Sequence, residues 1–292
     1  MSYEAWILIV GSLAGICCGI TGCFLILRRL AMLADAISHT VLLGMVLAFL
    51  ISQSLNGFYM LIGAAAIGVL TAVFVQLLHS SGIQEDASIG VVFTFLFAVG
   101  VILLSLYADH VHLDVDHALM GEITFVPWDL VKWGFFPQLP KAFLMLTTVL
   151  IINLLIIILF YKELKITSFD PQMAAAIGIP VLLIHYILMG MVSMTTVASF
   201  DSVGAILVVA MLIAPGASAY LLTDKLNIML IMSALLGVAA AIIGYYLASW
   251  LDVSISGSMA TVNGVIFAIF FFFAPHKGVL SKRWSQRKLK LT

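Results

Sequence analysis

The feature that most constrains this chain is a series of apolar runs, each long enough to cross a lipid bilayer. A helix needs about 20 predominantly apolar residues to span the hydrocarbon core, and runs of this length recur along the whole sequence. The chain is therefore expected to be an all-α, polytopic transmembrane bundle that forms a single domain over residues 1–292. Nine spans are predicted, with eight or ten as alternatives, at roughly residues 6–27, 35–52, 59–79, 88–107, 142–161, 181–198, 203–222, 228–250 and 257–273.

The composition agrees with a membrane bundle and argues against several other classes. Hydrophobic residues make up 63% of the chain and charged residues only 9%, whereas a typical soluble domain is about 25% charged. The formal net charge of -1 gives no reason to expect a nucleic-acid partner. The three cysteines, Cys17, Cys18 and Cys23, all lie in the first apolar run. They are expected to be small packing residues there, not a disulfide framework or a zinc site.

The basic residues predict the orientation, because Lys and Arg are in excess in cytoplasmic loops. With the N-terminus outside, only Lys132 and Lys141 of the 13 basic residues fall on the external side. An odd number of spans then places the C-terminus in the cytoplasm of a cell-membrane protein. The basic tail, residues 274–292, is expected to lie against anionic lipid headgroups.

The stretch from Arg28 to Leu50 contains the most informative polar residues. Asp35 and His39 lie at or inside the edge of an apolar span, where an ionisable group costs at least about 2–3 kcal/mol and usually marks a functional site. In a helix these two residues are one turn apart on the same face, a face that Ser38 shares. A carboxylate and an imidazole without a nearby thiolate suit manganese, iron(II) or zinc, and argue against copper(I). The alternative is that Asp35 caps the second span and that His39 is a satisfied buried histidine.

An acidic, histidine-rich segment follows the fourth span, inside a stretch (108–141) that is too polar to be a simple span. This stretch is predicted to be a loop or partly re-entrant. Its residues Asp109–His117, with Glu122 shortly after, offer several metal ligands on a short arc. They form either an external metal entry or a solvated polar loop.

The internal loop Thr167–Pro180 has clear helix signals. Asp170 is a candidate N-cap and Pro171 suits the first helical position. Gly178 suits the end of the helix, and Pro180 lies beyond it. A two-turn helix is predicted on the cytoplasmic side of the membrane. It either rests on lipid or docks into a soluble partner.

Pro215 and Gly216 interrupt the seventh predicted span. Proline removes a backbone hydrogen bond and kinks a helix. The kink serves either packing between helices or gating of a transport path.

Several catalytic and nucleotide-binding signatures are missing from the sequence. It contains no G-x-x-x-x-G-K-[ST] phosphate loop, no H-E-x-x-H and no G-x-S-x-G. The sequence therefore offers no set of catalytic residues that would support a membrane-embedded enzyme. The spans also hold few acids, whereas a proton-coupled secondary carrier usually has more of them.

With these residues in view, the sequence resembles the permease subunits of bacterial metal-ion ABC importers, which carry manganese, zinc or iron. RRLAMLADAISHTVLLG resembles their signature R-R-x-A-L-x-G/A-D-A-x-S-H-x-x-L-x-G. Further similar segments follow in the same order over nearly the whole chain: residues 85–103, 112–129, 169–180 and 203–223. The segment 112–129 is similar to the Gram-positive manganese branch, although His117 and Met120 replace the Cys or Val and the Tyr or Phe expected there.

The resemblance implies an ABC importer permease fold, a homodimer, two separate ATP-binding subunits and an extracellular metal-binding lipoprotein. It implies that Asp35 and His39 line the path of the ion, and that Pro215 and Gly216 belong to a late span. No permanently bound cofactor is implied, only a transported divalent metal ion. Asp114, Asp116, His117 and Glu122 would lie at the external entry. The coupling helix that contacts the ATPase would include Asp170, Pro171, Gln172, Ala175 and Gly178.

The sequence therefore predicts a permease, not an enzyme, that imports a divalent metal ion, with manganese favoured. Zinc or iron is the alternative ion. The alternative mechanism is a secondary carrier that needs no ATP-binding partner. The predicted helix at 169–180 argues against it, because such a helix could dock into a soluble partner subunit.

Overall fold

The computed structural model describes residues 3–53, 57–107, 123–133, 136–275 and 277–281. Within these ranges, nine helices are long and apolar enough to cross a membrane, as the sequence predicts. They are α1 (Tyr3–Leu27), α2 (Ala31–Ser52), α3 (Gly57–Ser80), α4 (Glu85–Tyr107), α6 (Lys141–Leu159), α9 (Val181–Val203), α10 (Ala205–Leu222), α11 (Leu226–Leu251) and α12 (Ile255–Phe273).

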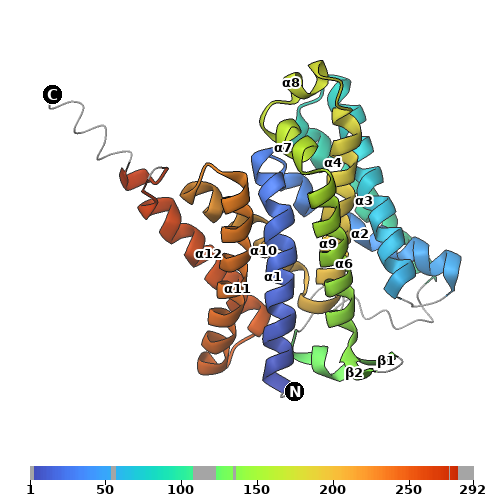
Figure 1. The fold of residues 1–292 in the computed structure, drawn as a ribbon. Helices are drawn as coiled ribbons and strands as arrows, with labels where there is room; N and C mark the ends of the chain where they lie inside the picture. The colour runs from blue at the N-terminus through green and yellow to red at the C-terminus, as the bar shows by residue number, and fades with distance from the viewer. Residues whose placement is uncertain (1–2, 54–56, 108–122, 134–135, 276, 282–292) are drawn as a thin grey trace, which may run out of the picture.

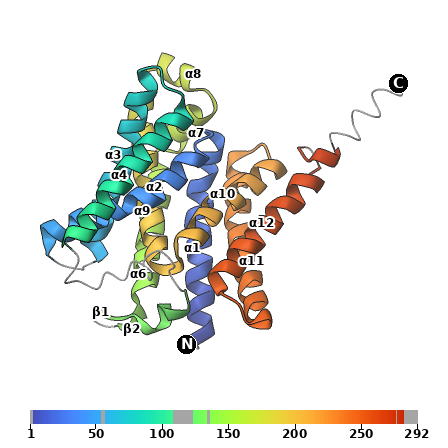
Figure 2. The same ribbon diagram turned by 180° about the vertical axis from the view of Figure 1, so that it is seen from behind.

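Helix α1 is the centre of the bundle. It packs against α6, α9, α10 and α11. Helices α2, α3 and α4 stand on one side of it, and α10, α11 and α12 stand on the other (Figure 1). The view from behind shows the same division (Figure 2).

Small residues bring α1 unusually close to its neighbours. A Cβ atom added to Gly15 would lie 2.7 Å from the backbone of Gly237 on α11. At Gly22 an added Cβ would lie 1.8 Å from the carbonyl oxygen of Leu212 on α10, so no larger residue fits this crossing. Close backbone approach through small residues is a common way to pack helices in membranes, where dispersion contacts replace the hydrophobic effect.

The predicted role of the three cysteines agrees with the structure. Cys17, Cys18 and Cys23 are free and buried within α1. The Sγ atom of Cys18 lies 3.5 Å from the hydroxyl of Ser199 on α9, and the thiol of Cys23 donates to the carbonyl of Met229 on α11 at 3.6 Å. These side chains fill the space between α1 and its neighbours.

Two further short helices form the end of the bundle opposite the N-terminus (Figure 1). Helix α8 (Pro171–Ala176) is the helix predicted in the internal loop. Helix α7 (Tyr161–Phe169) is not predicted by the sequence analysis, which treats its first residue as the end of a span and the rest as loop. Only Phe160 lies between the end of α6 at Leu159 and the start of α7 at Tyr161. The sequence has no Gly or Pro there to indicate that one helix ends and another begins.

The described part of the 108–141 segment lies beside the N-terminal end of α1 (Figure 1). It consists of a 3₁₀ helix, η1 (Ile123–Trp128), and an antiparallel hairpin of β1 (Leu130–Trp133) and β2 (Phe136–Pro140). The hydroxyl of Tyr3 donates to the carbonyl of Thr124 at 2.7 Å, which ties η1 to the start of α1. The hairpin is an addition to the predicted all-α architecture.

The close α1–α10 crossing yields the first prediction. Gly22→Ala places a methyl group where the Leu212 carbonyl lies, so the helices must separate. Overpacking of this kind typically costs about 1–3 kcal/mol. The thermal unfolding midpoint of the purified protein in detergent should fall.

Gly90→Ala is the matched control, because nothing lies within 4 Å of a Cβ added at this position of α4. Its unfolding midpoint should equal or exceed that of the natural protein, since alanine favours a helix more than glycine does. Equal midpoints for the two variants would contradict the crossing geometry.

Candidate functional site

Helix α2 begins earlier than the predicted span. Its first residue is Ala31, and its N-cap is Leu30, which makes no side-chain capping bond. Asp35 therefore lies in the second turn of the helix and does not cap it. The alternative that explains Asp35 as a cap is wrong.

Asp35 and His39 lie on the same face of α2, as predicted. His39 Nε2 is 3.8 Å from Asp35 Oδ1. The Asp35 side chain is 48% exposed and that of His39 is 35% exposed, so both remain open to a ligand. Ser38 does not join them, because its side chain is buried and its hydroxyl donates to the Asp35 backbone carbonyl at 2.6 Å.

Aromatic residues of α4 form a wall beside the imidazole. The ring centroids of Phe93 and Phe97 lie 5.3 Å and 5.9 Å from that of His39. These rings limit the rotation of the imidazole and offer no polar group to it. The carboxylate of Asp35 is the group within ion-pair reach of His39 among the described residues.

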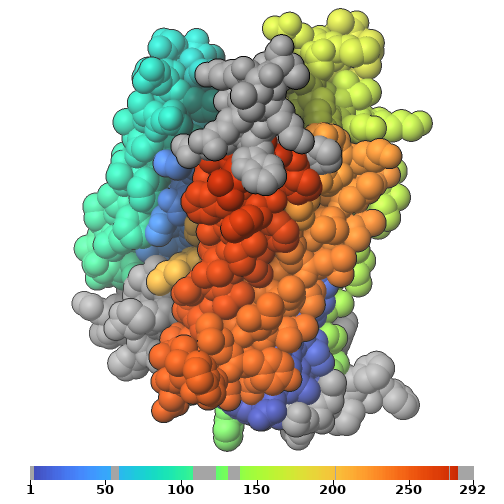
Figure 3. Space-filling view, turned by 90° about the vertical axis from the view of Figure 1, so that its left-hand side faces the viewer, coloured from blue at the N-terminus to red at the C-terminus, as the bar shows by residue number. Residues whose placement is uncertain are grey.

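Helix α2 is recessed in the surface of the bundle. Seen from the side of α12, it lies behind and between α4 and α12 (Figure 3). A half-exposed carboxylate does not face hydrocarbon in a stable membrane protein. A water-filled path or another protein surface is the energetically favourable surrounding for this part of α2.

The described part of one chain does not contain a complete metal site. Within the described ranges, no group of three or more His, Cys, Asp or Glu side chains is arranged to hold a metal ion. If Asp35 and His39 bind an ion, its remaining ligands must come from elsewhere, such as water or a second protein chain.

The four predicted entry residues lie outside the part of the chain that the structure describes: Asp114, Asp116, His117 and Glu122. Their role as an external metal entry stays a prediction. The basic tail of residues 274–292 is described only as far as Ser281, with a gap at residue 276.

The predicted capping signals of the internal loop are confirmed. The Asp170 carboxylate accepts from the backbone N–H of Met173 at 2.9 Å, and Pro171 occupies the first turn of α8. Gly178 has φ +84°, a left-handed conformation that suits glycine at a helix end. The side chains of Gln172 and Ala175 are exposed on the short helix between these signals.

Pro215 and Gly216 lie inside α10, which continues from Ala205 to Leu222 through them. Both residues are buried. A Cβ added to Gly216 would lie 3.1 Å from the backbone of Gly22, at the same crossing with α1. The local geometry favours the packing interpretation, and a gating role stays a prediction.

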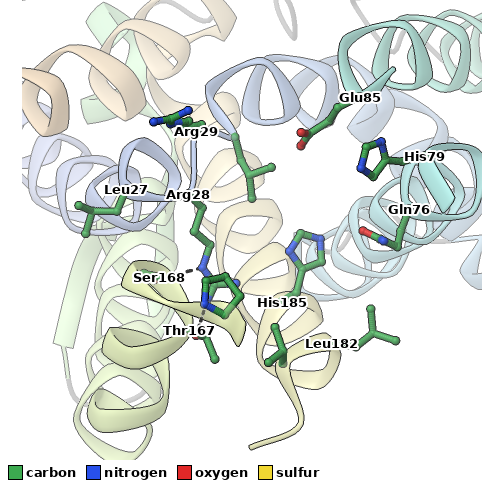
Figure 4. A pocket seen from close by; sticks show the side chains of 13 residues that line it. Leu27, Arg28, Arg29, Gln76, His79, Glu85, Thr167, Ser168, Leu182 and His185 are labelled. Atoms are coloured by element: carbon green, nitrogen blue, oxygen red, sulfur yellow. Dashed lines mark hydrogen bonds between the residues drawn. The ribbon is translucent and has the colours of Figure 1, made fainter. Parts of the chain in front are cut away.

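The structure shows a functional candidate to which the sequence analysis assigns no role of its own, Arg28. Arg28 lies in the turn between α1 and α2, beside a cavity of about 700 Å³ that also has Arg29, His79, Glu85 and His185 in its lining. Arg28 points toward Thr167 and Ser168 at the end of α7, and Arg29 points away from them (Figure 4). Burial lowers the pKa of Arg28 to about 10, so the guanidinium is still protonated at neutral pH.

The orientation of Arg28 depends on the backbone of its neighbour. Arg29 has φ +62°, a left-handed conformation that glycine usually adopts at a helix end. The sequence contains no glycine at this turn, so no signal indicates which of the two arginines faces the bundle.

Comparison with known proteins gives a consistent result. A model of the ABC 3 transport family matches residues 2–274. The manganese transport system membrane protein MntD of Bacillus subtilis is 64% identical over 97% of this chain and 96% of its own length. The zinc transport system membrane protein TroD of Treponema pallidum is 44% identical over 98% of this chain and 78% of its own length.

A solved structure has a similar fold. It is that of PsaBC from Streptococcus pneumoniae in complex with Fab, and its matched chain has a TM-score of 0.79 and 32% identity. The match covers all of this chain and 95% of the other. The nine helices of this length in the described ranges, together with these relatives, make the chain a multi-pass cell-membrane protein.

The capping of α8 yields the second prediction. Asp170→Ala removes the acceptor for the Met173 N–H, a loss worth about 1 kcal/mol at a helix N-terminus. Hydrogen exchange of the amides of residues 173–176 should become roughly fivefold faster, since exchange follows the local opening free energy. Asp170→Asn retains a capping oxygen and should leave exchange nearly unchanged, and equally slow exchange in the Ala variant would contradict the capping role.

Proposed function

Since the chain belongs to the ABC 3 transport family, we propose that it is the membrane-spanning permease subunit of an ATP-binding cassette importer for a divalent metal ion. The observation that carries this proposal is the half-exposed Asp35–His39 pair on a recessed membrane helix. Such a pair is costly in lipid and useful on an ion path.

The ligand types favour a particular group of ions. Carboxylate and imidazole suit manganese, iron(II) and zinc. Manganese is favoured because the relative at 64% identity is named for manganese transport. Zinc is the next candidate, since a second relative is named for zinc.

A homodimer would complete the site. A two-fold axis beside α2 would bring a second Asp35 and His39 to the same ion, because a symmetric interface repeats each residue on both sides. The second copy would also cover the half-exposed carboxylate. The four ligands would be Asp35 and His39 of each copy. A site divided between two chains can open when the chains separate, which suits an ion that must be released.

The end of the bundle that holds α7 and α8 suits the ATP-binding subunits. Near α8, three large apolar side chains are exposed although they lie outside the spans: Phe169 (55%), Met173 (58%) and Ile177 (57%). A capped helix with exposed apolar side chains can insert into a groove of a soluble partner. The hairpin and the start of α1 lie at the opposite end of the bundle, where an extracellular metal-binding lipoprotein would deliver the ion.

The mechanism follows from this arrangement. ATP binding and hydrolysis on the partner subunits would move α8 and rock the two permease copies between outward-facing and inward-facing states. Asp35 and His39 would replace part of the hydration shell of the ion while it is enclosed. Because each copy would contribute Asp35 and His39 to a shared site, a change in the distance between the copies would weaken the site and release the ion.

The third prediction tests the ligand pair. Asp35→Ala and His39→Ala should each lower metal uptake by well over tenfold in cells, since loss of a mere outer-sphere partner already costs about 10–100-fold in affinity. Membrane insertion and association with the ATP-binding subunits should persist. Asp252→Asn, at the turn between α11 and α12, is the control and should transport normally.

Undiminished uptake in both ligand variants would refute the proposed path. Uptake by the chain alone in liposomes, driven only by an ion gradient, would instead support a secondary carrier.

The fourth prediction concerns the ion. In cells that lack this chain, elemental analysis with manganese, zinc or iron limiting in turn should show a selective fall in manganese. A selective fall in zinc would retain the mechanism and change the substrate, and unchanged levels of all three metals would contradict the importer function.

A further inference from the structure

The side chain of Arg28 joins two parts of the molecule that lie far apart in sequence. Its Nη2 donates to Thr167 Oγ1 at 2.7 Å and its Nε donates to Ser168 Oγ at 3.1 Å. Figure 4 shows the guanidinium directed at these two hydroxyls. The contact links the α1–α2 turn to the last turn of α7.

On one side of this contact, the α1–α2 turn is short and closed by backbone bonds. The N–H of Arg29 donates to Ile26 at 3.1 Å, and the N–H of Leu30 donates to Leu25 at 2.9 Å. Helix α2 begins at the next residue, Ala31. A displacement of Arg28 would therefore also displace the first two turns of α2, where Asp35 lies.

On the other side, the two hydroxyls are fixed to α7. Thr167 Oγ1 donates to the carbonyl of Glu163 at 2.7 Å, and Ser168 Oγ donates to that of Leu164 at 2.6 Å. Asp170, which caps α8, follows after a single residue. A motion of α8 that carried α7 with it would therefore move the acceptors of the Arg28 bonds.

The start of α7 is fixed as well. The Tyr161 hydroxyl donates to Asn227 Oδ1 on α11, and Leu164 is fully buried. Helix α7 is thus attached at both ends, to α11 at its first residue and to Arg28 at its last turn.

We propose that Arg28 is a positioning residue that transmits the movement of the α7–α8 unit to the Asp35–His39 pair through its paired bonds to Thr167 and Ser168. This inference rests on the proposed function, because it needs an ATP-driven motion of α8 and an ion at α2. The structure favours Arg28 over Arg29 for this role, since only Arg28 is directed at α7.

The chemistry of the contact suits a link that must re-form in each cycle. Within the described ranges no carboxylate lies within ion-pair distance of Arg28, so its partners are neutral hydroxyls. Hydrogen bonds from a charged donor are stronger than neutral ones, and the planar fork of Arg fixes direction in a way that Lys does not. The bonds are therefore directional without forming a permanent ion pair.

The test measures coupling rather than activity alone. The permease, its ATP-binding subunits and the metal-binding lipoprotein are reconstituted in liposomes, and manganese uptake and ATP hydrolysis are measured together. Arg28→Gln, and separately Thr167→Val with Ser168→Ala, should keep ATP hydrolysis near the natural rate. The number of ions moved per ATP should fall at least about fivefold, the lower end of typical coupling between sites.

Two controls separate coupling from general damage. Arg29→Gln removes the same charge from the adjacent residue and should keep the natural ratio of ions to ATP. Combining all three substitutions at residues 28, 167 and 168 should be no worse than Arg28→Gln alone, because residues that act through one contact are not additive.

The outcomes distinguish this inference from the proposed function. Absence of manganese, zinc and iron uptake by the natural complex would overturn the proposed function and this inference with it. Normal uptake by the natural complex, with an unchanged ratio in Thr167→Val/Ser168→Ala, would overturn the role of Arg28 alone. That double variant retains Arg28 and so decides the matter even if Arg28→Gln fails to assemble. An equal loss of coupling in Arg29→Gln would also overturn the inference.

Discussion

A carboxylate exposed on the side of a membrane bundle must be covered by something other than lipid, and much of this structure follows from that constraint. Asp35 is nearly half exposed on α2, one turn from His39. The cost of such a group in hydrocarbon explains why α2 is recessed and why a second protein surface is expected beside it. The same two side chains are proposed to form part of a metal site, and a second copy of the chain is proposed to supply both the cover and the remaining ligands.

The packing of α1 supports this arrangement by giving the bundle a rigid centre. Gly15 and Gly22 allow α11 and α10 to approach α1 at backbone distance, and side chains of α9 hydrogen-bond to other helices, as between Thr195 and Asn153 at 2.7 Å. The α2–α4 group lies on one side of this centre. A rigid centre with separate groups of helices on each side suits a permease that must move one group relative to another.

The sequence predicts the nine spans well because each apolar run is bounded by charged residues or turn signals. It also predicts the cap and the stop of α8, since Asp170, Pro171 and Gly178 carry local information. It misses α7, where Tyr161–Phe169 mixes polar and apolar residues and follows α6 after the single residue Phe160. The contact of Arg28 with Thr167 and Ser168 is beyond sequence reasoning, because it depends on the left-handed backbone of Arg29 and on two segments about 140 residues apart.

The central claim is that Asp35 and His39 bind the transported ion, and electron cryo-microscopy of the assembled transporter with manganese tests it most directly. The account predicts density for one ion between the Asp35 carboxylates and His39 imidazoles of two copies, absent in the Asp35→Ala variant. Manganese density elsewhere in the membrane region, unchanged by that substitution, would contradict it.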